Sequence, residues 1–167
     1  LQGVRTDSRV RAQMLQHLEA GAIDKARQAG ASSSDFVARA LVQALAHATH
    51  FADAMPAAAA RELERYNRGL SVLDTIITLA PLLGLLGTVT GMIRSFGMLG
   101  GAELGAPSAI TGGIAEALIA TAFGLGVAIL ALLPFNFVNA LQEKARLQLQ
   151  EAGTAAELLL KVQTARA

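Results

Sequence analysis

The sequence predicts an all-α integral membrane protein with two transmembrane helices that are extended by long cytoplasmic helices. Of its 167 residues, 53% are hydrophobic and 16% are charged, which is apolar for a soluble domain. The hydrophobic excess is concentrated in residues 70–99 and 108–141, and each segment is long enough to cross a bilayer as a helix. We expect the remaining residues to form helices outside the membrane.

The first 69 residues are expected to form a cytoplasmic helical region. A helix is predicted over residues 7–20, where apolar residues recur at helical spacing. Asp7 or Thr6 can cap its first turn, and Gly21 can end it.

Two more helices are predicted before the first apolar segment. The first covers residues 22–29 and is expected to end at Gly30. The polar run at residues 32–35 has good N-cap chemistry, so a third helix is expected from about residue 34 to residue 53.

Pro56 breaks or kinks that third helix, or opens the next helix in its first turn. From Pro56 the pattern is helical as far as Leu99, and we expect one continuous helix about 65 Å long at 1.5 Å per residue. Residues 70–99 form its transmembrane part, and a turn over residues 100–107 follows on the periplasmic side.

The second transmembrane helix is expected over residues 108–141, with a cytoplasmic helical tail over residues 142–167. Pro134 lies inside this helix, where a kink is tolerable if neighbouring groups satisfy the freed carbonyl. Gly153 is expected to be its weakest point.

Basic residues flank the two spans on one side only. The connecting turn has one acidic residue and no Lys or Arg, and the flanking cations are Arg61, Arg65, Arg68, Lys144 and Arg146. Because cytoplasmic loops carry the excess of basic residues, both chain ends are expected in the cytoplasm.

Glu116 is the one acidic or basic residue between Pro107 and Gln142. An ionisable group at membrane depth is costly and often marks an ion or proton path. Burial favours the neutral form of a carboxyl, which suits a proton-linked group. The alternative is a structural hydrogen bond or ion pair between helices, for example with Arg94.

Each span has a stripe of small residues at helical spacing, which lets helices pack closely in lipid. The stripes are Gly84, Thr88, Gly91 and Ser95 in the first span, and Gly113, Ala117, Thr121, Gly124 and Ala128 in the second. Thr88 and Thr121 either bond their own backbone and pack, or face a central polar path shared by several copies. Glu116 lies about 140° from Thr121 around the helix, so the two residues are expected to make different contacts.

Other classes of function have little support in the sequence. The net charge of +1 gives no strong field for nucleic acid, and cysteine is absent. His47 and His50 lack a third ligand, so no metal site is expected. No phosphate-binding glycine motif and no nucleophile–base pair occurs, so we expect neither a cofactor nor an enzyme.

Two ordered motifs resemble a known family. The sequence APLLGLLGTVTGMI at residues 80–93 is similar to the second-span motif of the ExbB/TolQ/MotA proton-channel family. The sequence GIAEALIATAFGL at residues 113–125 is similar to its third-span motif, and Asn136 also matches. The resemblance covers about residues 70–140 and is nearer to the ExbB and TolQ branches than to MotA, with ExbB favoured.

The resemblance implies a three-span protein whose first span precedes Leu1. It implies a pentamer in the bacterial inner membrane around a single-span partner, ExbD, whose membrane aspartate carries protons inside a ring of threonines. Thr88, Thr121 and Glu116 are then the functional positions. The complex would use the proton gradient to drive TonB-dependent outer-membrane transport, with the proton as transported ion.

The sequence departs from the family pattern at a few positions. Thr90 stands where the family usually has Trp, and Gly112 stands where Pro usually precedes the third-span motif. The usual late proline falls at Leu130, and Pro134 follows one turn later. A TolQ-like or MotA-like stator subunit, or a passive membrane scaffold held together by Glu116, are the alternative interpretations.

Overall fold

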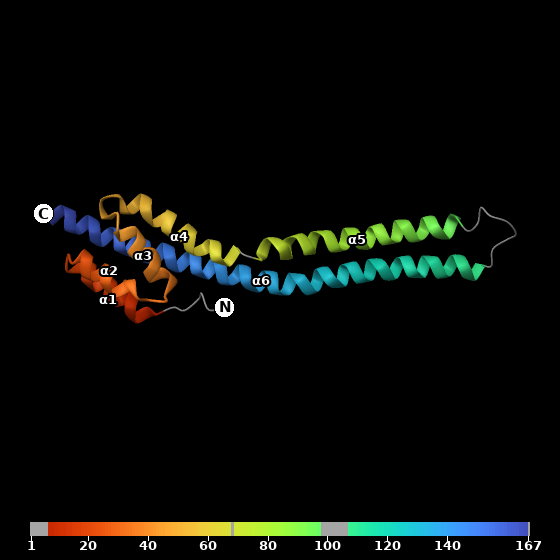
Figure 1. The fold of residues 1–167 in the computed structure, drawn as a ribbon, viewed down its shortest axis with the longest axis horizontal. Coiled ribbons are helices and arrows are strands. Elements are labelled where there is room, and N and C mark those ends of the chain that lie inside the picture. The colour runs from red at the N-terminus through yellow and green to blue at the C-terminus, as the bar shows by residue number, and fades with distance from the viewer. Residues whose placement is uncertain (1–6, 68, 98–106, 167) are drawn as a thin grey trace. The chain divides into compact units, whose positions relative to one another are not determined.

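The computed structural model describes residues 7–67, 69–97 and 107–166, and within these ranges every regular element is helical (Figure 1). The chain divides into two compact units. The first unit comprises residues 1–68 and 140–167, and the second comprises residues 69–139. The predicted all-α fold is therefore confirmed.

The first unit is a small helical bundle. Its elements are α1 (Ser8–Glu19), α2 (Ile23–Ala31), α3 (Phe36–Leu45), the short 3₁₀ helix η1 (Ala48–His50), α4 (Phe51–Asn67) and the C-terminal part of α6 (Pro107–Arg166). Asp7 caps α1 by accepting a hydrogen bond from the Arg9 backbone N–H, as expected. Gly21 follows the end of α1 with a φ of 74°, a left-handed conformation that favours glycine.

Gly30 does not end α2, contrary to the prediction, but lies inside it and is buried. A Cβ atom at this position would lie 2.6 Å from Val42 Cγ2 and 2.7 Å from the sulfur of Met14. Close packing between helices therefore requires glycine here, and no left-handed cap is involved.

The prediction of one helix over residues 34–53 is wrong. Asp35 caps α3, but α3 ends at Leu45 and η1 intervenes before α4 begins at Phe51. His47, with φ −123° and ψ 53°, leaves the helical conformation, and Pro56 lies inside α4 rather than opening it. The break lets Phe51 and Met55 pack into the same core as α3.

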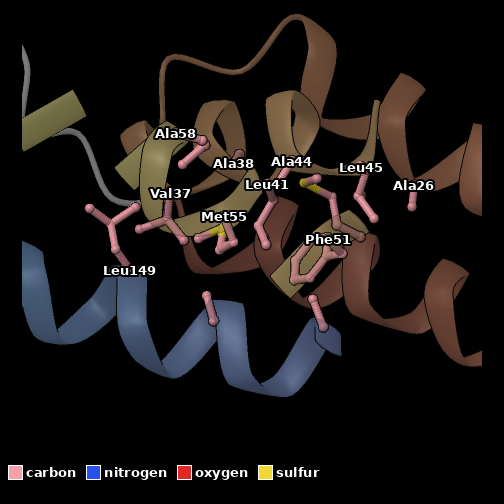
Figure 2. Close-up of a cluster of buried hydrophobic side chains, with 14 of the residues drawn as sticks. Ala26, Val37, Ala38, Leu41, Ala44, Leu45, Phe51, Met55, Ala58 and Leu149 are labelled. Carbon is pink, nitrogen blue, oxygen red and sulfur yellow. The ribbon is translucent and has the colours of Figure 1, made fainter. Parts of the chain in front are cut away.

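The first unit has a continuous hydrophobic core (Figure 2). α6 contributes four buried hydrophobic residues to this core, Ala145, Leu149, Ala152 and Ala156. Gly153 does not interrupt α6, and a Cβ atom there would lie 2.9 Å from Met55 Cγ. Gly153 is thus a close packing position against α4.

Two carboxylates are buried in this unit with cationic partners. Asp35 accepts hydrogen bonds from the backbone N–H groups of Val37 and Asp7, and its Oδ2 lies 3.1 Å from Arg11 Nε. Arg39 donates to both carboxylate oxygens of Glu62, at 3.2 and 2.6 Å, which links α3 to α4. Removing one partner of such a pair leaves a buried charge uncompensated.

The second unit is a helical hairpin built from α5 (Leu70–Gly97) and the first part of α6. The prediction of one continuous helix from Pro56 to Leu99 is wrong, because Gly69 has a φ of 92° between α4 and α5. The predicted turn at residues 100–107 lies outside the described residues except for Pro107, where α6 begins.

α6 runs for 60 residues through Pro134, as predicted. α5 and the segment Thr111–Ala165 of α6 are each long and apolar enough to cross a membrane. Only 6% and 11% of their most apolar windows are buried. Their apolar side chains therefore face outward from the hairpin, as those of membrane-spanning helices do.

Candidate functional site

The candidate site lies along the contact between α5 and α6 in the second unit. At Gly84, a Cβ atom would lie 3.0 Å from Thr121 Cα and 3.1 Å from the Ala120 carbonyl oxygen. At Gly124, it would lie 2.5 Å from the Ala80 carbonyl oxygen and 3.0 Å from Gly84 Cα. The two backbones touch here, and only glycine permits that approach.

The same close contact continues toward the connection between the helices. A Cβ atom at Gly91 would lie 2.7 Å from Ala117 Cβ, and one at Gly113 would collide with the Ser95 hydroxyl. Ser95 is buried and donates to the Gly91 carbonyl oxygen at 2.9 Å. The structure thus brings the five positions expected to pack helices, Gly84, Gly91, Gly113, Ala117 and Gly124, into one seam.

The two threonines make different hydrogen bonds. Thr121 Oγ1 donates to the Gly84 carbonyl oxygen at 3.0 Å, across the seam to the other helix. Thr88 Oγ1 donates to the Leu85 carbonyl oxygen of its own helix at 2.7 Å. Both side chains are half-buried. The two acceptor carbonyls belong to consecutive residues of α5, Gly84 and Leu85, so the two hydroxyls lie at nearly the same level of the hairpin.

Glu116 lies on a different side of the hairpin from Thr121. It lines a hollow of about 220 Å³ together with Thr90 and Arg94 of α5, and neither Thr88 nor Thr121 borders that hollow. The floor is formed by small residues of the seam, among them Gly87, Gly91, Gly113, Ala117 and Ala120. The hairpin therefore has a threonine edge, with Thr88 and Thr121, and a carboxylate edge, with Glu116, Thr90 and Arg94.

The side chain of Glu116 is exposed in the single chain. Arg94 borders the same hollow, yet no ion pair joins it to Glu116 among the residues that the structure describes. A carboxylate that faces hydrocarbon is expensive. A second protein surface or water must therefore cover the carboxylate edge when the hairpin is in a membrane.

The hollow at Glu116 was not anticipated from the sequence as a group of three polar residues. Thr90 and Arg94 are four residues apart, so they lie on one face of α5. The sequence already suggested Arg94 as a partner for Glu116, but placing Thr90 beside the same carboxylate requires the register of α5 against α6. The register is set by the glycine contacts.

The histidines of the first unit border a separate hollow. His47 and His50 lie with Asp53 and Arg61 around a space of about 350 Å³. No group of three or more His, Cys, Asp or Glu side chains arranged to hold a metal ion occurs in the described part of the chain. We therefore assign no function to His47 and His50.

The fold and the site together define a helical membrane protein with a tightly packed hairpin and a carboxylate, Glu116, within the apolar stretch of α6. The sequence profile of the MotA/TolQ/ExbB proton channel family matches residues 22–151 of the chain. The chain therefore belongs to this family. The match extends well into the first unit, beyond the residues 70–140 in which the motifs were recognised.

Curated relatives agree with this family. A putative biopolymer transport protein ExbB-like 1 of Synechocystis is 47% identical over 111 residues, 65% of this chain and 44% of the relative. A putative biopolymer transport protein ExbB-like 3 of Synechocystis is 39% identical over 148 residues, 84% of this chain and 69% of the relative. The Tol-Pal system protein TolQ of Haemophilus influenzae is 40% identical over 94 residues, 54% of this chain and 41% of the relative. The chain thus spans less than half of the first of these relatives.

Proposed function

We propose that this chain is the channel subunit of a proton-driven, ExbB-like motor in the bacterial inner membrane. The motor would use the proton gradient to drive TonB-dependent transport across the outer membrane. The observation that supports this most strongly is the glycine-packed hairpin, in a proton-channel family member, with hydroxyls on one edge and a carboxylate on the other.

In this proposal, the threonine edge faces a central lumen. Thr121 donates its proton to the Gly84 carbonyl, so the lone pairs of its oxygen are free to accept a hydrogen bond. The same holds for Thr88, which donates to the Leu85 carbonyl. A ring of such acceptors can hold the protonated carboxyl of a partner in the lumen, and water can bridge to it after the proton leaves.

Glu116 is proposed to belong to the proton pathway from the carboxylate edge. The hollow beside it offers the Thr90 hydroxyl and the Arg94 guanidinium, which can orient water against the carboxylate. The chemistry is transfer of a proton between oxygen atoms, so neither an enzyme active site nor a cofactor is invoked.

The assembly that we propose is a homopentamer around an ExbD-like single-span partner, coupled to a TonB-like protein. Both chain ends would lie in the cytoplasm and residues 100–107 in the periplasm. The outward-facing apolar side chains of α5 and α6 are available for lipid and for neighbouring copies.

Proton flux in reconstituted vesicles tests this function. The full-length chain, purified with its single-span partner, is expected to dissipate an imposed pH gradient, and vesicles with the partner alone are not. Thr88→Val combined with Thr121→Val is expected to reduce this flux while the complex keeps its mass. Flux equal to that of empty vesicles for the wild-type complex would contradict the proposal.

Two alternative functions are each supported by a specific observation. The similarity to TolQ supports a subunit of the same type in a different motor, which identification of the co-purifying single-span protein would reveal. The exposed carboxylate edge also suits a passive scaffold in which Glu116 joins helices of neighbouring chains. A scaffold would assemble and conduct no protons.

A further inference from the structure

The start of α5 has a polar face. It is made of four exposed residues that lie within about 100° of one another around the helix, Ser71, Asp74, Thr75 and Thr78. Gly87, which packs against Ala120 of α6, lies on the opposite side of α5. The α5 polar face therefore points away from α6 within the hairpin.

The α5 polar face does not continue along the helix. Beyond it, the same side of α5 has Leu82, Leu85 and Val89, which are 58%, 57% and 42% exposed. Because these side chains are apolar, water reaches the α5 polar face from the end of the helix at Leu70. In the topology proposed above, that end lies on the cytoplasmic side.

Asp74 is the ionisable residue of the α5 polar face. The hydroxyls of Thr75 and Thr78 donate to carbonyl oxygens of their own helix, at 2.7 Å for Thr75 and 3.0 Å for Thr78. Asp74 itself is exposed, and it forms no ion pair with any residue that the structure describes. The carboxylate is thus open to water.

The charged residues of the hairpin helices lie far from Asp74. Arg94 is twenty residues further along α5, about 30 Å away. Glu116 borders the same hollow as Arg94, and α6 has no other acidic or basic residue before Glu143. Neither α5 nor the part of α6 packed against it therefore supplies a charge that would neutralise Asp74.

Asp74 lies on the threonine edge of the hairpin. It precedes Thr88 by fourteen residues, which places the two side chains about 40° apart around α5 and about 21 Å apart along it. Thr90 and Arg94 are each about 160° from Asp74, on the carboxylate edge. The threonine edge thus has hydroxyls at its middle and one carboxylate at its inner end.

The stretch of α5 between Thr88 and Asp74 also has a polar backbone group. Pro81 lies inside α5 on this edge, and proline has no N–H group. The Ile77 carbonyl oxygen therefore lacks its usual donor four residues further along. This oxygen offers water an acceptor between the two levels.

We propose that Asp74 is the inner proton-exchange group of the channel. It would pass protons between the lumen lined by Thr88 and Thr121 and the water at the cytoplasmic end of α5. This inference rests on the proposed function and adds a residue to its pathway.

The proposed exchange moves a proton between oxygen atoms only. The carboxylate of Asp74 takes a proton from water in the lumen and gives it to water outside, which returns it to the ionised form. Several copies would place a ring of carboxylates at the mouth, and such rings favour cations. A ring of this kind raises the local proton concentration and the rate of capture.

Proton flux at two buffer concentrations tests this role, with the full-length chain purified with its single-span partner. At low buffer, Asp74→Asn is expected to lower the flux about tenfold while the complex keeps its mass. A high concentration of a membrane-impermeant buffer such as MES should restore most of that flux, because the buffer then exchanges protons at the mouth. Asp74→Glu should keep most of the flux at either concentration.

Two variants are matched controls for this test. Thr78→Val changes the α5 polar face one turn further along without removing a charge. Glu64→Gln removes an exposed carboxylate from the first unit. Both should conduct as wild type does at low buffer.

Labelling of introduced cysteines tests where Asp74 points, because the chain has no cysteine of its own. Ile76 is two residues from Asp74 and about 160° away around α5, so it lies on the opposite side at almost the same depth. A charged maleimide should label Asp74→Cys several-fold faster than Ile76→Cys in membranes. Equal or slower labelling of Asp74→Cys would overturn the inference.

The outcomes of the flux test separate this inference from the proposed function. Wild-type flux in Asp74→Asn at low buffer would overturn the role of Asp74 alone. A loss of flux that buffer does not relieve, or dissociation of the Asp74→Asn complex, would also overturn it, because Asp74 would then act in folding or assembly. A wild-type complex that conducts no protons would overturn the proposed function itself.

Discussion

Thr121 and Glu116 are five residues apart on α6 and lie on opposite edges of the hairpin. Thr121 is fixed by a hydrogen bond to the Gly84 carbonyl oxygen on the neighbouring helix. Glu116 borders a hollow with Thr90 and Arg94. In the proposed function, Thr121 would hold a partner group in a defined position, and Glu116 would exchange a proton with water.

Replacing Thr121 by Val keeps the shape of the side chain and removes the hydroxyl. The lost hydrogen bond across the seam is worth about 0.6 kcal/mol on average inside membranes, so assembly should survive. Proton flux should fall several-fold, and Thr121→Ser should retain most of it.

Thr78→Val is the control for this experiment. Thr78 is exposed, and its hydroxyl donates only to the Asp74 and Thr75 carbonyl oxygens of its own helix. Its loss should leave flux unchanged. Equal flux in Thr121→Val and wild type would show that Thr121 only packs.

At the scale of elements, α5 and α6 are held together by glycine rather than by large side chains. Gly124→Ala puts a Cβ atom 2.5 Å from the Ala80 carbonyl oxygen. Separating the backbones to fit it should cost about 1–3 kcal/mol. We therefore expect a lower thermal unfolding midpoint and a reduced yield of assembled complex.

Gly126→Ala is the matched substitution two residues further along the same helix. Nothing lies within 4 Å of a Cβ atom there. Because alanine favours the helix over glycine, this variant should be as stable as wild type or slightly more stable. If both variants lose stability to a similar degree, close packing between α5 and α6 at Gly124 is not the cause of the loss.

The junction between α4 and α5 depends on one backbone conformation. Gly69 has a φ of 92° with no atom near the position of a Cβ. Gly69→Ala should thus destabilise the chain through backbone strain alone, by about 1–3 kcal/mol. Gly69→Asn should cost less because Asn tolerates positive φ better, and Gly97→Ala should be close to neutral. Thermal unfolding in detergent measures all three.

The sequence was a good guide to elements with a strong local signal. The two apolar segments, the Asp7 cap, a cap from the polar run at residues 32–35 and the stop at Gly21 are all present in the structure. Gly69 was overlooked because it lies within a strongly helical pattern. The break at His47 has no glycine or proline to mark it in the sequence, and the packing of Phe51 and Met55 into the core, which the break allows, is a tertiary contact.

The candidate site was predictable only in part. The small residues could be identified because they recur at helical spacing within the apolar segments. Glu116 could be identified because it is the one charged residue in its apolar segment. The hydrogen bond from Thr121 to Gly84 and the hollow shared by Glu116 and Arg94 depend on how α5 and α6 are aligned. The spacing of residues along one helix does not determine how that helix is aligned with its neighbour.

Across the whole molecule, the two units differ in whether their large hydrophobic side chains are buried or exposed. The first unit buries its hydrophobic side chains in a core and leaves only Leu147, Leu158 and Val162 strongly exposed among its large, described hydrophobic side chains. The second unit exposes most of its leucine, isoleucine and valine. This division is expected of a chain that joins a membrane-spanning hairpin to a helical bundle with its own hydrophobic core.

We propose that Glu116 handles protons rather than only joining helices. The most direct test pairs native mass spectrometry with proton flux for Glu116→Gln and Glu116→Asp, each in the full-length chain purified with its single-span partner. We predict that both variants keep the mass of the wild-type complex, that Glu116→Gln loses most of the flux and that Glu116→Asp loses less. Wild-type flux in Glu116→Gln, or dissociation of the complex in that variant, would contradict the claim.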